Sequence, residues 1–162
     1  MPTLRFYQTQ GTTPAEVDAV LPPLLQKMLA GGHQVLLVCP SSARQTRLDE
    51  ALWTFSAGSF LPHACVQAKL PGPQPVLLAL EADALAHANG TVPLVLGGAE
   101  SVLPALTECT PLTCYVFGTQ AAEVARARQS WQQAPVTWHK EYWQQTDKGW
   151  HQKQLARPTS MA

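Results

Sequence analysis

The apolar positions of the N-terminal part alternate between short continuous runs and stretches with helical spacing. The first run, at residues 4–7, predicts a short strand. Thr13, Pro14 and Glu16 then predict a helix start. A threonine can cap the helix, proline fits its first position, and the glutamate can reach back to the cap. Apolar residues at helical spacing follow, so we expect a helix after the first strand.

Two prolines interrupt this helical pattern. Pro22 and Pro23 lie inside it, and a proline within a helix removes a backbone hydrogen bond and clashes with the preceding turn. We therefore expect a kink or a break at these residues. Gly31 and Gly32 follow the last apolar position, and they are expected to end the helix.

A continuous apolar run at residues 35–38 predicts a strand that is buried on both faces, as in a parallel sheet. A helix should follow it, with Ser41 or Ser42 as its cap and with Leu48 and Leu52 on its inner side. This order of strand, helix, strand and helix favours a parallel α/β fold with right-handed connections.

The rest of the chain continues this alternation. The predicted strands are 76–80, 92–96 and 114–117, and the predicted helices are 101–106 and 120–133. Pro93 has no amide hydrogen, so the strand that contains it should begin there or lie at a sheet edge. Segment 56–75 is rich in proline and glycine, which is typical of a loop. Without repeats or linkers, the chain should form one domain, 1–153, followed by a disordered tail, 154–162.

The composition narrows the class of protein. With 162 residues, 46% hydrophobic and 14% charged, the chain is expected to fold around a core rather than to be disordered. Eleven basic residues balance eleven acidic ones, so the net charge is zero, which argues against a general nucleic-acid coat protein. No membrane span, secretion signal or zinc-like cysteine spacing is visible. We therefore expect a reduced, cytoplasmic protein without a metal site.

The motifs of common catalytic and nucleotide sites are absent from the sequence. It has no G-x-x-x-x-G-K-[ST], no G-x-G-x-x-G after the first strand, no G-x-S-x-G and no H-E-x-x-H. No catalytic residue, cofactor or phosphate-binding loop is therefore predicted. One alternative remains from the α/β pattern: a small enzyme or nucleotide-binding domain that uses the strand carboxyl ends, near Cys39-Pro40 or Gly97-Gly98.

Two segments resemble a known family. The first is residues 47–53, an arginine followed by L-D-E-A-L-W, and the second is residues 60–63, F-L-P-H. Together they resemble the signature of the chi subunit of bacterial DNA polymerase III. Residues 142–145 and 149–150 are similar to the C-terminal end of one branch of that family. The resemblance covers nearly the whole chain, to about Lys153. It implies a three-layer, Rossmann-like α/β sandwich with a mainly parallel sheet and no nucleotide site, and a non-catalytic role in DNA replication.

The resemblance also implies partners. It implies a protein at replication forks that connects the psi subunit of the clamp-loader assembly to the acidic C-terminal tail of single-stranded DNA-binding protein. An accessory helicase is a further candidate, DNA contact is expected to be indirect or weak, and no membrane is involved. Trp53, Phe60 and Pro62 match the psi-contacting residues of the family, and exposed aromatics near prolines are typical of docking surfaces. The alternative is that Trp53 and Phe60 cover the core.

The C-terminal quarter differs from the rest of the chain in charge. Residues 1–121 contain five basic and eight acidic side chains, net −3, whereas residues 122–162 contain six basic and three acidic ones, net +3. Four of the five tryptophans lie in this second part. A basic, aromatic surface suits an acidic peptide with an aromatic end, because arginine can bind a carboxylate in a bidentate way.

The resemblance assigns residues to such a tail-binding site. The predicted residues are Tyr115, Arg126, Arg128, Trp131 and Lys140. The two arginines match basic positions of the family's tail-binding helix, the tyrosine falls near a pocket wall, and the tryptophan and lysine would add a ring and a charge. Gln129 and Ser130 depart from the family, which has an aromatic and a basic residue there. Two alternatives are solvated arginines with core tryptophans, and direct binding of single-stranded DNA.

Overall fold

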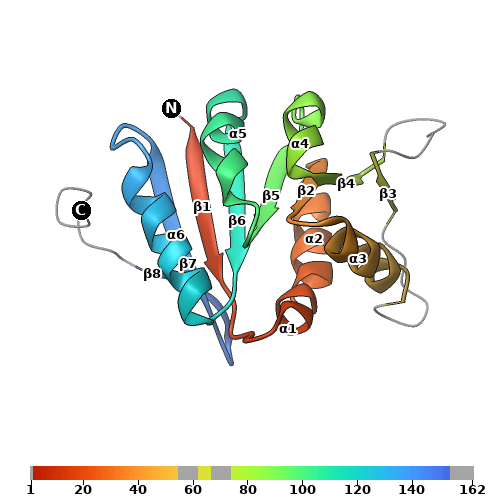
Figure 1. Cartoon of the computed structure of the whole chain (residues 1–162), viewed down its shortest axis with the longest axis horizontal. Coiled ribbons are helices and arrows are strands. Elements are labelled where there is room, and N and C mark those ends of the chain that lie inside the picture. Colours follow the sequence, from red (N-terminus) through yellow and green to blue (C-terminus); the bar gives the residue numbers. More distant parts are fainter. Residues whose placement is uncertain (1, 55–61, 67–73, 154–162) are drawn as a thin grey trace.

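The computed structural model describes residues 2–54, 62–66 and 74–153, which form one open β-sheet with helices on both faces (Figure 1). The strands are β1 (Thr3–Gln8), β2 (Val35–Cys39), β3 (His63–Cys65), β4 (Val76–Leu80), β5 (Val92–Leu96), β6 (Leu112–Phe117), β7 (His139–Thr146) and β8 (Gly149–Lys153). Their order in the sheet is β3-β4-β2-β5-β6-β1-β7-β8. Only the pair β7–β8 is antiparallel among these strands. The predicted, mainly parallel α/β fold is confirmed.

Helices cover the sheet from both sides. They are α1 (Pro14–Asp18), α2 (Leu21–Ala30), α3 (Ser42–Thr54), α4 (Glu81–Ala84), α5 (Leu103–Cys109) and α6 (Ala121–Gln133), with short 3-10 turns at Leu85–His87 and Glu100–Val102. One core lies between α1, α2, α3 and the sheet, and a second lies between α4, α5, α6 and the opposite face. This is the predicted three-layer sandwich. None of the helices in the described ranges is long and apolar enough to cross a membrane.

The expected break at the prolines is present. A capping box starts α1: the Glu16 amide donates to the Thr13 hydroxyl at 3.2 Å, and the Thr13 amide donates to the Glu16 carboxylate at 3.0 Å. α1 ends before Pro22 and Pro23, which lie in the first turn of α2. There the missing amide hydrogen costs no helical bond. Gly32, with φ of 86°, follows the end of α2, in a conformation that favours glycine.

Strand β5 lies between β2 and β6 in the centre of the sheet, so the expectation of an edge strand at Pro93 is wrong. The other expectation, that the strand begins there, is confirmed, because Pro93 is the second residue of β5. The Val92 amide donates to the Gln34 carbonyl at 2.7 Å, on the β2 side. The next residue, Pro93, therefore faces β6, where pairing begins only at Leu94, opposite Cys114. Pro93 can lie in a central strand because the hydrogen bonds between β5 and β6 begin only after it, so its missing amide hydrogen leaves no bond unmade.

Several elements differ from the pattern-based expectation. The sequence pattern does not predict β3, α4 or the β7–β8 hairpin, whose strands are polar and only partly buried. The short helix expected at 101–106 instead begins as a 3-10 turn and continues as α5 to Cys109. Trp53 is 55% exposed at the end of α3, so the interpretation that it covers the core is wrong. Phe60 and the expected tail, 154–162, lie outside the described residues.

Candidate functional site

Helix α6 carries three of the predicted tail-binding residues, and they point to two different sides. Arg126 faces the 3-10 turn Glu100–Val102 that precedes α5: its Nε donates to Oε1 of Glu100 at 2.9 Å. Arg128 lies on the β7 side, where its charge acts on the hydroxyl of Tyr142. Residues two apart on a helix of 3.6 residues per turn stand on nearly opposite sides. The two arginines therefore cannot hold the same carboxylate from one side of the helix.

On the α5 side, Glu100 connects two of the predicted residues. Its Oε1 accepts from Arg126 Nε and also from the hydroxyl of Tyr115, at 3.1 Å. The Tyr115 ring is fully buried. Burial, together with the charge of Glu100, raises the pKa of Tyr115 far above its usual value, so the hydroxyl stays a donor. Sequence reasoning did not identify Glu100, which lies 26 positions before Arg126 and has no motif of its own.

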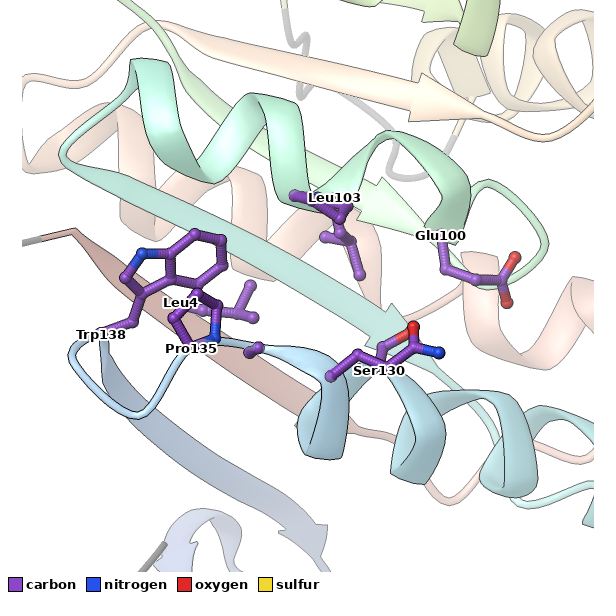
Figure 2. A pocket seen from close by; sticks show the side chains of 9 residues that line it. Leu4, Glu100, Leu103, Ser130, Pro135 and Trp138 are labelled. Atoms are coloured by element: carbon purple, nitrogen blue, oxygen red, sulfur yellow. The ribbon is translucent and has the colours of Figure 1, made fainter. Parts of the chain in front are cut away.

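A small cavity of about 50 Å³ lies between α5 and α6 beside this network. Figure 2 shows Glu100 at one end of the cavity and Trp138 at the other, with Leu103 of α5 and Ser130 of α6 on facing walls. Its lining is largely apolar, and Glu100 is the charged side chain among the described residues that line it. The cavity can accept an apolar group, and Arg126 is held beside it through Glu100.

The departure from the family at Ser130 falls on the wall of this cavity. Arg126 and Ser130 are four residues apart on α6, so they lie on the same side of the helix. A basic residue at position 130 would add a cation to the wall of the cavity, whereas serine adds none. The positive charge available at this end of the cavity therefore comes mainly from Arg126.

The β7 side of α6 holds the other predicted residues in a packed cluster. Trp131 is 6% exposed, and its ring packs edge-to-face on Phe6 at 5.2 Å and on Tyr142 at 6.0 Å. Lys140 Nζ donates to the Trp131 carbonyl at 3.1 Å and lies 5.0 Å from the centre of its ring. Burial lowers the pKa of Lys140. Trp131 is therefore a core residue that joins α6 to β7, and the Lys140 ammonium lies over its ring.

The predicted psi surface is described in part. The exposed Trp53 ring packs against the His63 ring, with centroids 5.1 Å apart. His63 Nε2 lies 3.0 Å from a carboxylate oxygen of Asp49 and 3.2 Å from its carbonyl oxygen. Pro62 precedes His63 and is partly exposed. The histidine thus brings Trp53 and Pro62 to one surface, while Phe60 lies outside the described residues.

The strand carboxyl ends are closely packed by the protein itself. A Cβ on Gly98 would stand 2.9 Å from the side chain of Pro40, and one on Gly97 would stand 3.2 Å from the Glu123 carboxylate. The Gly118 amide donates to Glu123 at 2.6 Å. The carboxylate occupies a backbone amide at these strand ends, and its charge would repel a phosphate there. Within the described ranges, no group of three or more histidine, cysteine, aspartate or glutamate side chains could hold a metal ion.

Comparison with known proteins gives one family. A protein-family model described as DNA polymerase III chi subunit, HolC, matches residues 1–137, which is more than half of the chain. The match runs from the first strand to the end of α6, and it stops before β7. None of the curated proteins compared matches the chain.

Proposed function

The chain belongs to the chi subunit family of DNA polymerase III, which gives it an accessory role in DNA replication. From this we propose that it works by binding other proteins. One surface binds the psi subunit of the clamp-loader assembly. A second surface binds the acidic C-terminal tail of single-stranded DNA-binding protein. In this proposal the protein acts in the cytoplasm at replication forks, with an accessory helicase as a further candidate partner.

The observation that carries the tail-binding proposal is the position of Arg126 beside an apolar cavity. The terminal carboxylate of the peptide binds the Arg126 guanidinium, and its terminal aromatic ring enters the cavity between α5 and α6. Tyr115 and Trp131 are buried and hold Glu100 and α6 in place. Arg128 and Lys140, on the far side of α6, attract the acidic residues upstream of the peptide end.

Glu100 limits the strength of this site. Its carboxylate occupies the Nε–H of Arg126, but a guanidinium has further N–H donors in the same plane. A peptide carboxylate that binds those donors lies close to the Glu100 carboxylate, and the two negative charges repel each other. With Ser130 replacing a basic residue, we expect binding in the micromolar range, about −8 kcal/mol.

Calorimetric titration with a peptide that copies the acidic tail tests this proposal. Arg126→Ala should weaken binding by about 1–3 kcal/mol, because a charge-assisted hydrogen bond is lost. Arg128→Ala should weaken it less, and only at low salt, because that arginine acts at long range. Lys27→Ala, which removes the same charge from α2 on the opposite face, is the matched control and should not change binding. Absence of binding at low salt would refute the proposal.

The psi surface is tested separately. Trp53→Ala should abolish co-purification with a co-expressed psi subunit, because a large exposed aromatic side chain is removed from the contact. Val136→Ala, which truncates another exposed apolar side chain on a different part of the surface, is the control. The melting temperature of Trp53→Ala should stay close to that of the unmodified protein. Undiminished co-purification would show that the partner, if it binds, uses another surface.

A further inference from the structure

The face of the sheet that packs against α2 extends beyond this helix onto β1, β7 and β8 (Figure 1). Three aromatic side chains lie on this part of the sheet. Tyr7 pairs in register with Trp143 of β7, and Trp150 of β8 pairs with Gln145, two residues further along β7. The Tyr7 and Trp150 rings are 5.1 Å apart. Three neighbouring strands therefore bring aromatic rings side by side on one face, with Tyr7 buried beneath the partly exposed Trp143 and Trp150.

These rings line a groove of about 250 Å³, five times the volume of the cavity between α5 and α6. Leu24 and Met28 of α2 form its other wall. Trp143 and Trp150 are only partly buried. The groove is therefore apolar and aromatic over most of its length, and it has room for a planar ring.

Basic side chains border one end of the groove. Lys27 and His33 are exposed there, next to Arg5. Arg5 is paired with Glu141 at 2.9 Å, and Trp143 Nε1 donates to the same carboxylate oxygen at 3.0 Å. None of the described residues that line the groove is acidic. A ligand here meets aromatic rings along its length and positive charge at one end.

We propose that this groove binds single-stranded DNA, with bases stacked on the Trp143 and Trp150 rings and phosphates near Lys27 and His33. Aromatic side chains on adjacent strands of an open sheet face are a known way to stack successive bases, and stacking tolerates any base sequence. Lys27 supplies complementary charge for the phosphates, and the His33 ring can donate a hydrogen bond to one. An acidic peptide would also be attracted by Lys27, but one terminal ring would leave most of the aromatic surface unused. Single-stranded nucleic acid therefore fits the groove better.

The DNA site is independent of the proposed peptide site. Trp143 and Trp150 lie beyond residues 1–137, the part matched by the family model. The groove is on the α2 face of the sheet, whereas Arg126 and its cavity are on the α6 face. Because only a few cations border the groove and the whole chain has zero net charge, binding is weak and sensitive to salt. Such a contact would hold the protein near DNA that is already exposed at the fork.

Fluorescence anisotropy of a labelled oligothymidylate of roughly eight nucleotides, titrated with the full chain at low salt, tests the proposal. Saturable binding that weakens as salt is raised is expected. Lys27→Glu should weaken it by roughly tenfold, because an attractive charge becomes a repulsive one. Trp150→Ala should also weaken it by roughly tenfold, through lost stacking. Arg126→Glu, the matched charge reversal on the opposite face, should leave oligonucleotide binding unchanged.

The same variants, checked for an unchanged thermal unfolding midpoint, are titrated with the acidic tail peptide. We expect the reverse pattern, in which Arg126→Glu weakens peptide binding and Lys27→Glu does not. Three results would overturn the DNA site: no saturable oligonucleotide binding, binding that neither Lys27→Glu nor Trp150→Ala reduces, or loss of peptide binding in Lys27→Glu. The last result would identify the groove as a peptide site. If both Arg126→Glu and Lys27→Glu still bind the peptide, the result counts against the proposed peptide site and leaves the DNA site untouched.

Discussion

Replacement of Glu100 by glutamine should strengthen binding of the acidic tail peptide. The Glu100 carboxylate lines the cavity, accepts from Arg126 Nε at 2.9 Å and accepts from the Tyr115 hydroxyl at 3.1 Å. Glutamine keeps an oxygen that can accept from the tyrosine, but it has no charge. The same oxygen can still accept from Arg126, but the guanidinium charge is no longer neutralised by Glu100 and the peptide carboxylate is no longer repelled.

The size of the effect follows from the exposure of the two side chains. Two unit charges about 5 Å apart interact by about 0.8 kcal/mol in water and by about 3 kcal/mol at an effective dielectric constant of 20. The Arg126 side chain is 44% exposed and that of Glu100 is 19% exposed, so screening by solvent is strong. We therefore expect a gain of about 1 kcal/mol, or about fivefold in Kd. The fold should lose about 0–1 kcal/mol with the ion pair.

Titration calorimetry with the tail peptide measures this gain, at low salt and again at raised salt, where the gain should shrink. Glu108→Gln is the matched control, because it makes the same change of charge at an exposed position of α5 that does not line the cavity. The reasoning is refuted if Glu100→Gln binds the peptide no better than the unmodified protein. It is equally refuted if Glu108→Gln gives the same gain.

Two further predictions concern stability. Arg44 and Asp18 form a nearly buried ion pair at 2.7 Å, so Asp18→Asn should cost about 3–5 kcal/mol in urea unfolding, and a change below about 1 kcal/mol would contradict this. Burial raises the pKa of Glu141, but hydrogen bonds from Trp143 and Arg5 outweigh it and lower the pKa overall. The contribution of Glu141 to stability is therefore present above its unfolded pKa, about 4.3, and is lost as the pH falls through the lower folded value. Unfolding measured over a pH series should show that Glu141→Gln reduces this acid sensitivity.

The elements that could be predicted from the sequence are those with local signals. Strand β2 is five consecutive apolar residues, all buried, and such a run suits few other structures. The capping box at Thr13 and Glu16 and the prolines at 22 and 23 act within a few residues of the chain, so their effects on the helices were predictable. The family signature in residues 47–53 is also a local feature, and the family match confirms the family that it indicated.

The β7–β8 hairpin lacked a local signal. β7 reads His-Lys-Glu-Tyr-Trp-Gln-Gln-Thr, with polar residues on both faces, and it becomes a strand by pairing with β1, more than 130 positions earlier. Strand formation of this kind depends on the neighbouring strand more than on intrinsic preference. The groove lined by Tyr7, Trp143 and Trp150 was hidden for the same reason, although the tryptophan-rich end of the chain was visible in the sequence.

The sequence by itself determined the α/β class, the family and the concentration of positive charge and tryptophan after residue 121. These features depend on composition, local periodicity and motif, which do not require knowledge of distant contacts. Only the tertiary structure decided which of these residues act together. It placed Arg126 and Arg128 on opposite sides of α6, paired Arg126 with a distant Glu100, and buried Trp131 while leaving Trp53 exposed. The physical reason is that side-chain direction and burial are set by the elements packed against each residue, which the order of residues along the chain does not specify.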